Sequence, residues 1–167
     1  MKWNWKNITL ILIFLLLQIV WFNHISLFGK YTPVIYLYPF LILPVNKDES
    51  INLITGFFAG LILDIFTNTG GVFAATTVLL IFLKKNYFLI NKNPSQDVEE
   101  MQVSKLNFIQ KTIFFGIFIF IGLIFIYLLD SFSFKILISK FGYILINTLI
   151  SLFFYIFIDA LFTGKET

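Results

Sequence analysis

One acidic residue closes a long apolar stretch of the sequence, and its position raises the question of what chemistry it could do. Residues 52–64 read NLITGFFAGLILD, in which Gly56, Gly60 and Asp64 recur every fourth residue. On an α-helix this spacing places the three residues along one stripe, with apolar side chains over the rest of the surface. The carboxylate could accept hydrogen bonds, and the glycines could let another helix backbone approach closely.

Two interpretations of this stripe are open. An aspartate costs roughly 2.5–3.5 kcal/mol at the centre of a membrane and less toward an interface, so it usually faces a partner or a cavity. Asp64 could have a structural role at the outer end of its helix, hydrogen-bonded to the turn at residues 67–70, or it could bind a partner or ligand. Gly56 and Gly60 could likewise pack within the protein or against a helix of another protein.

Three other polar residues in or near apolar runs are candidates for a specific role. Asn147 lies deep in a predicted helix, where we expect its amide to form an interhelical hydrogen bond worth roughly 1 kcal/mol. Asp159 lies one turn from the end of the last predicted helix, near Lys165, and is expected to be an interfacial acid, with a specific partner as the alternative. His24 is expected at the outer interface, since no neighbouring cluster of ligands suggests a metal site or a catalytic triad.

Motifs of common enzyme classes are absent from the sequence. It contains no P-loop, GxSxG, HExxH or nucleotide-binding fingerprint, and it has no cysteine. We therefore predict that the protein is not an enzyme and needs no cofactor or metal. All 12 basic residues are lysine, and the net charge of +3 is interpreted as a signal of membrane orientation rather than of nucleic-acid binding.

The composition is typical of an all-α polytopic membrane protein. Of the 167 residues, 59% are hydrophobic and 13% are charged, and the mean hydropathy is +0.91. A hydrocarbon layer of roughly 30 Å needs about 20 apolar residues per helix, so the chain fits one integral membrane domain of about six crossings. We predict helices at about 8–28, 33–45, 51–66, 72–83, 112–129 and 141–162, and a polar cytoplasmic segment at 84–111. The second helix is short and contains three prolines.

Six crossings would place both termini on the same side of the membrane. Lys30, Lys135 and Lys140 fall on the opposite side, whereas the other nine lysines share the side of the termini. By the positive-inside rule the side that holds the termini and the nine lysines is cytoplasmic. Without the second crossing, the orientation of everything after it would be reversed.

The stretch from Pro33 to Leu83 resembles the core of the rod shape-determining protein MreD family. The shared elements are a proline-led helix, a short polar turn, a G-x-x-x-G-L-x-x-D pattern and a turn with glycine, followed by a helix. In this sequence they are Pro33, Gly56, Gly60, Leu61, Asp64, Gly70 and Gly71. The phenylalanine-rich later helices and the longer polar segment at 84–111 depart from the family pattern.

This resemblance implies a non-enzymatic scaffold of the bacterial cell elongation machinery in the inner membrane, which supports rod shape and lateral peptidoglycan synthesis. The implied partners are MreC first, and RodA, the elongation transpeptidase and MreB directly or indirectly, besides membrane lipid. The first choice of contact surface is the face of Gly56, Gly60 and Asp64 with the turn that contains Gly70 and Gly71.

The MreD family is also similar in fold to the substrate-binding subunits of energy-coupling-factor transporters. The resemblance therefore leaves an alternative, a vitamin-binding membrane subunit. Such subunits tend to carry an alanine-based motif on the first helix, and this chain has no alanine before Ala59. The sequence thus favours the scaffold.

Overall fold

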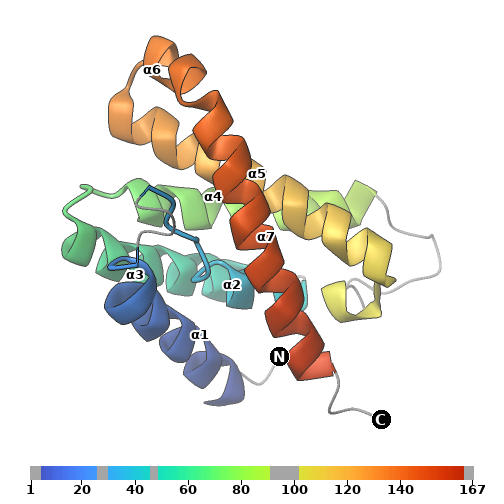
Figure 1. Cartoon of the computed structure of the whole chain (residues 1–167). Helices are drawn as coiled ribbons and strands as arrows, with labels where there is room; N and C mark the ends of the chain where they lie inside the picture. The colour runs from blue at the N-terminus through green and yellow to red at the C-terminus, as the bar shows by residue number, and fades with distance from the viewer. Residues whose placement is uncertain (1–4, 26–29, 46–48, 91–101, 164–167) are drawn as a thin grey trace.

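The computed structural model describes residues 5–25, 30–45, 49–90 and 102–163, with side chains as far as residue 161. In these ranges the chain forms helices and no strand (Figure 1). The first helix, α1, continues directly into a π-helical turn, η1. In chain order the elements are α1 (Trp5–Leu17), η1 (Gln18–Phe22), α2 (Tyr38–Ile42), α3 (Ser50–Thr67), α4 (Val72–Ile90), the 3₁₀ turn η3 (Val103–Lys105), α5 (Phe108–Ser131), α6 (Phe134–Ser139) and α7 (Phe141–Thr163).

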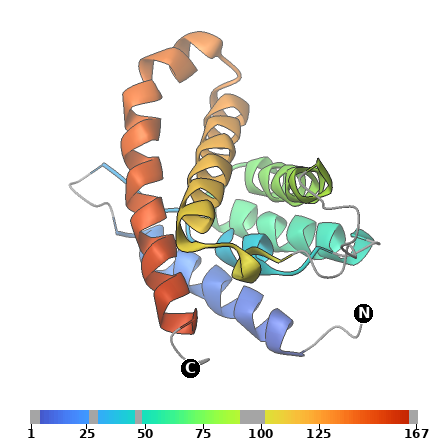
Figure 2. The same cartoon turned by 90° about the vertical axis from the view of Figure 1, so that its right-hand side faces the viewer.

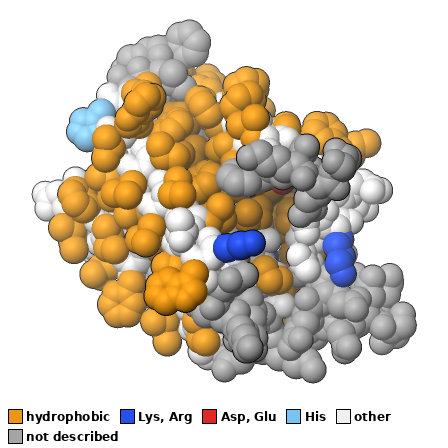
Figure 3. Space-filling view, turned by 90° about the horizontal axis from the view of Figure 1, so that it is seen from below, with side chains coloured by type: hydrophobic (Ala, Val, Ile, Leu, Met, Phe, Trp, Pro, Cys, Tyr) orange, Lys and Arg blue, Asp and Glu red, His pale blue; other side chains and the backbone are white. Residues whose placement is uncertain are grey.

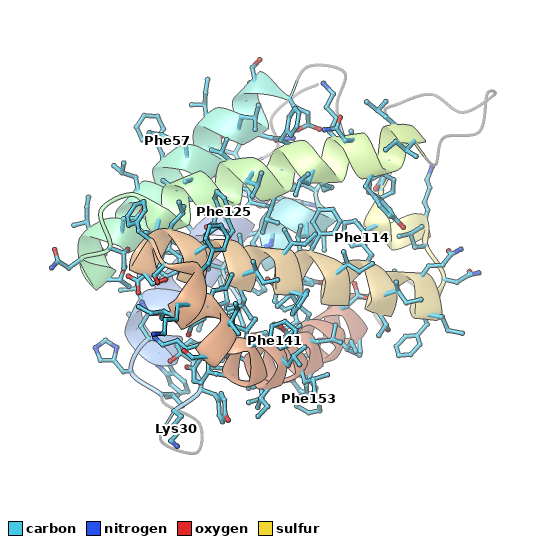
Figure 4. All side chains as sticks on the ribbon, turned by 90° about the horizontal axis from the view of Figure 1, so that it is seen from above. Lys30, Phe57, Phe114, Phe125, Phe141 and Phe153 are labelled. Atoms are coloured by element: carbon cyan, nitrogen blue, oxygen red, sulfur yellow. The ribbon has the colours of Figure 1, made fainter. Side chains whose placement is uncertain are left out.

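Five helices in the described ranges are long and apolar enough to cross a membrane: α1 with η1, α3, α4, α5 and α7. Their outer surfaces are apolar, and Figure 3 shows one face on which hydrophobic side chains cover most of the described surface. Phe57 and Phe153 point away from the bundle and are 44% and 67% exposed, whereas Phe114 lies inside it (Figure 4). The prediction of an all-α membrane protein is confirmed.

The helices form two hairpins. The first, α3 with α4, is a close antiparallel pair that runs side by side in both ribbon views (Figures 1 and 2). Asn68 ends α3 in a left-handed conformation with a φ of 56°, and Gly70 and Gly71 follow with φ of 64° and 102°. In the second hairpin, α6 connects α5 to α7. The start of α5 is fixed by a capping box of Asn107 and Gln110.

The predicted second crossing at 33–45 is not a helix of spanning length. Only Tyr38–Ile42 is helical, and the residues from Tyr31 to Tyr36 are largely irregular. Pro39 lies in the first turn of α2, where its missing N–H costs nothing, and Pro44 follows the end of this helix. Proline also disfavours the helical conformation of the residue before it. We call residues 31–45 the central segment.

The central segment passes through the interior of the bundle from one end to the other. Its first ring, Tyr31, stacks on Tyr143 at the start of α7, and its last part contacts Lys84 toward the end of α4. Leu37 is 1% exposed and Leu41 is 0% exposed. Non-helical backbone at membrane depth is tolerated only where protein or a water-filled cavity surrounds it, and here protein does.

The start of α1 and the end of α7 lie at the same end of the bundle, because Asn7 and Asp159 line one cavity. We call this the Asp159 end. The opposite end contains residues 67–71 and the start of α7, because Thr32 lines a cavity with Thr67 while its neighbour Tyr31 stacks on Tyr143. We call it the turn end.

The predicted helix boundaries agree with the structure at some positions and not at others. The predictions 51–66 and 141–162 lie within one residue of α3 and α7. The first helix was predicted too long, because the helical path ends at Phe22. The predictions 72–83 and 112–129 were too short, since α4 continues to Ile90 and α5 begins at Phe108. Both ends of the polar segment predicted at 84–111 are thus helical, and residues 91–101 lie outside the described residues.

Candidate functional site

Asp64 connects the end of α3 to the beginning of α4. Its side chain is buried, with 5% of the residue exposed. Its Oδ1 accepts hydrogen bonds from the Thr69 hydroxyl (2.6 Å) and the Phe73 N–H (3.0 Å), and its Oδ2 accepts one from the Ala74 N–H (2.9 Å). The first N–H groups of a helix have no acceptor within it, and negative charge is favourable there. Asp64 therefore caps α4 from the neighbouring helix.

The two glycines of the stripe also face α4. A Cβ atom on Gly60 would lie 2.4 Å from the Ala74 Cα, which is backbone and cannot move aside like a side chain. A Cβ atom on Gly56 would lie 2.4 Å from the Ile81 Cδ1. Glycine thus lets α3 and α4 approach closely. Of the two interpretations of the stripe, the structure places Gly56, Gly60 and Asp64 in packing within the protein.

The turn after α3 is the part of the predicted contact surface that stays accessible. Asn68 and Gly70 are exposed, and nothing lies within 4 Å of where a Cβ atom of Gly70 or Gly71 would be. A cavity of about 510 Å³ lies beside this turn. Its lining combines hydroxyl, amide and imidazole groups with apolar side chains: Ile19, Asn23, His24, Thr32, Phe66, Thr67, Thr69 and Phe73.

Asp159 forms an ion pair that links the ends of α5 and α7. The Lys111 Nζ lies 3.0 Å from the Asp159 Oδ2, and the Tyr38 hydroxyl donates to Oδ1 at 3.4 Å. The Lys111 side chain is 10% exposed and the Asp159 side chain is 22% exposed. Lys165, near which the sequence places Asp159, lies outside the described residues. Lys111 was missed because it was assigned to the polar segment.

The Lys84 side chain holds the end of the central segment. Its Nζ donates to the Phe40 carbonyl at 2.7 Å and to the Leu43 carbonyl at 2.9 Å, and the residue is 1% exposed. These carbonyls lie at the end of α2, where acceptors have no helical partner. The buried Glu49 carboxylate adds a favourable charge interaction with Lys84.

The Gln18 side chain, in the π-helical turn, holds the beginning of the central segment. Its Oε1 accepts from the N–H groups of Ile35 (2.7 Å) and Tyr36 (3.3 Å), and its Nε2 donates to the Pro33 carbonyl (3.1 Å). These bonds satisfy buried backbone N–H and C=O groups that have no hydrogen-bond partner in a helix or sheet. The sequence alone gives no signal for this role, since Gln18 is a single polar residue within an apolar run.

A polar stripe on α7 faces the central segment. Asn147, Ser151, Tyr155 and Asp159 recur every fourth residue, which places them on one side of the helix. The Ser151 hydroxyl accepts from the Val34 N–H at 3.1 Å. Contrary to expectation, the Asn147 side-chain oxygen has no hydrogen-bond partner among the described residues, and neither does the Tyr155 hydroxyl. The regular spacing of these four residues was the signal that could have revealed the stripe.

Within the described ranges there is no group of three or more histidine, aspartate or glutamate residues that could hold a metal ion. Comparison of the chain with family models, curated proteins and solved structures finds no match. A function is therefore proposed from the sequence pattern and from the contacts described above.

Proposed function

We propose that the protein is a non-enzymatic scaffold of the bacterial cell elongation machinery in the cytoplasmic membrane. It would support rod shape and lateral peptidoglycan synthesis by binding MreC and, directly or indirectly, RodA, the elongation transpeptidase and MreB. The observation that carries the proposal is the resemblance of residues 33–83 to the MreD family. It is supported by contacts that connect the elements of this stretch: Asp64 joins α3 to α4, and Lys84, the residue after the stretch, joins α4 to the central segment.

Because the glycine stripe faces α4, its role in this proposal is indirect. Gly56, Gly60 and Asp64 fix the shape of the α3–α4 hairpin, and the hairpin presents its outer side to the partner. That side consists of the exposed turn residues Asn68 and Gly70 and of membrane-facing side chains of α3. The membrane-facing residues are Ile54, Phe58, Ile62 and Ile65, between 36% and 71% exposed.

Depletion of the protein from growing cells tests the cellular role. Swelling or loss of rod shape is the expected result, since a scaffold of lateral wall synthesis is needed for elongation. Cells of normal shape that acquire a vitamin requirement would contradict the scaffold.

Crosslinking tests the contact surface. A photoreactive residue at Phe58, on the outer side of α3, should crosslink to MreC in intact membranes. The matched control is Phe153, an exposed phenylalanine on α7. Equal recovery of MreC from both positions, or from neither, would contradict a contact through the α3–α4 hairpin.

The alternative function is the substrate-binding subunit of a vitamin transporter, and the cavity of about 510 Å³ at the turn end favours it. Small-molecule sites combine apolar walls with a few polar groups, as this cavity does. Equilibrium binding of vitamins to the purified protein distinguishes the two functions. A saturable site that is lost on changing Thr32 to Val would support the transporter subunit.

A further inference from the structure

The connection between α5 and α7 exposes an unusual concentration of large apolar side chains. We call residues 132–140 the α6 loop. Phe132, Phe134 and Ile138 are 87%, 72% and 75% exposed, and α6 buries none of its residues. Figure 1 shows α6 at the tip of this hairpin, apart from α1 to α4. Contiguous apolar surface of this kind marks a surface that lies against lipid or another protein.

The length of α5 places the α6 loop at a membrane interface. Lys111 lies in the first turns of α5 and Asp159 in the last turns of α7, and the ion pair between them marks one interface. The helical path from Lys111 to Phe132 measures roughly 32 Å at 1.5 Å per residue. This length matches a hydrocarbon layer of roughly 30 Å, so the loop begins where the opposite headgroup layer begins.

The residue types of the loop fit that layer. The loop contains two lysines, Lys135 and Lys140, among its aromatic and aliphatic side chains. Their alkyl chains can lie along apolar surface while the ammonium groups reach the phosphates. The Lys140 Nζ lies 5.3 Å from the centre of the Tyr127 ring, and the exposed Asp130 is the acid of this region. Phe141 contacts Phe120 on α5, so the apolar surface of the loop continues into the membrane-facing surface of the hairpin.

The backbone of Phe132 is a second, independent observation. Its φ of 46° lies in the left-handed region, and its N–H donates to the Leu128 carbonyl at 2.9 Å, as in the cap of a helix end. Glycine or asparagine usually occupies this position, and a bulky residue there is an outlier. With 87% of the residue exposed, its ring gains little from contacts within the described protein. A contact outside the protein explains why an aromatic residue stands there.

We propose that the α6 loop is a membrane-anchoring element that lies in the headgroup layer at the turn end of the bundle. Phe132, Phe134 and Ile138 insert among the lipids, and Lys135 and Lys140 lie at the level of the phosphates. The occupant of this surface is lipid of the same bilayer rather than a partner protein. The inference is independent of the scaffold role.

The absence of native cysteine makes the depth of the loop measurable. Phe134→Cys and Ile138→Cys variants of the full chain, spin-labelled and reconstituted in phosphatidylcholine–phosphatidylglycerol vesicles, report accessibility to oxygen and to a water-soluble nickel chelate. The controls are Ile117→Cys, on the membrane-facing side of α5, and Lys105→Cys, exposed in η3. We expect both loop labels to lie between the controls. Nickel accessibility equal to that at position 105 would overturn the proposal, as would shielding from both reagents.

A substitution at Phe132 tests the anchoring ring itself. Phe132→Gly removes the ring and relieves the left-handed backbone, so the protein should remain folded, as size-exclusion chromatography in detergent checks. We expect nickel accessibility at a label on position 138 to rise at least twofold. An unchanged depth in the folded variant would overturn the anchoring role of Phe132.

Discussion

At the scale of single residues, the Asp64 carboxylate accepts hydrogen bonds from the Thr69 hydroxyl in the turn and from two N–H groups in the first turn of α4. We expect Asp64→Ala to lower the free energy of unfolding by about 1–3 kcal/mol, because buried donors then lose their acceptor. The free energy of unfolding of Asp64→Asn should lie between those of the native protein and of Asp64→Ala. Asparagine keeps one acceptor oxygen but turns an amide donor toward backbone N–H groups. The fraction of folded protein after heating, measured by size-exclusion chromatography, reports both changes.

The control for this prediction is Asp130→Ala at the exposed end of α5. Removal of an exposed carboxylate should change stability by less than about 0.5 kcal/mol. Equal losses at Asp64 and Asp130 would contradict the capping role of Asp64.

The close packing of α3 on α4 can be tested at Gly60, with Gly142 on α7 as the matched control. Gly60→Ala should destabilise the protein by about 1–3 kcal/mol, because the new Cβ atom would meet the backbone of Ala74 at 2.4 Å. Gly142→Ala should be neutral or slightly stabilising, since no atom lies within 4 Å of that position and alanine favours helix. Thermal denaturation of the two variants side by side measures the difference. If Gly142→Ala proved the more harmful, close packing of α3 on α4 would be refuted.

How far the sequence predicted these residues depends on where their partners lie. The four-residue spacing predicted that Gly56, Gly60 and Asp64 share a stripe, because that follows from helix geometry alone. It could not decide whether the stripe faces inward. Lys84 and Lys111 were assigned to a polar segment because a lysine is usually exposed. Their partners lie more than 40 residues away in the sequence, at Phe40 and Asp159, so only the tertiary structure shows that burial is possible.

At the scale of elements, the central segment depends on side chains of other helices for its backbone hydrogen bonds. Gln18→Leu removes the acceptor for the N–H groups of Ile35 and Tyr36 and the donor to Pro33. We expect amide hydrogen exchange in peptides covering residues 33–41 to accelerate at least tenfold, because the segment has no ladder or long helix of its own. Gln102→Leu, near η3, is the control. Unchanged exchange in the Gln18 variant would show that packing alone holds the segment.

The prolines predicted that this crossing is short or kinked, since each one disfavours continuous helix. That it is mostly non-helical and buried could not be predicted. The reason is that its hydrogen-bond partners come from η1, α4 and α7, and their positions follow from the packing of the whole bundle.

The Lys111–Asp159 pair joins two elements against their helix dipoles, with a cation at the start of α5 and an anion at the end of α7. Lys111→Asp and Asp159→Lys should each lower stability by about 2–3 kcal/mol, less than for a fully buried pair because Asp159 is 22% exposed. The double variant Lys111→Asp with Asp159→Lys should recover at least half of the lost stability. It places an acid at the start of α5 and a base at the end of α7, as the helix dipoles favour. A double-mutant cycle of thermal stability measures the coupling. Additive losses would mean that the two side chains do not stabilise each other.

At the scale of the whole molecule, five spanning helices alone would place the start of α1 and the end of α7 on opposite sides of a membrane. The central segment adds a further passage, so we expect both on the same side, and the excess of lysines there predicts the cytoplasm. Single-cysteine variants at Lys6, Ala160 and Lys30 test this with a membrane-impermeant maleimide on intact cells. Only Lys30→Cys, at the turn end, should be labelled before the cells are opened. Labelling of just one of positions 6 and 160 would mean that the central segment does not cross.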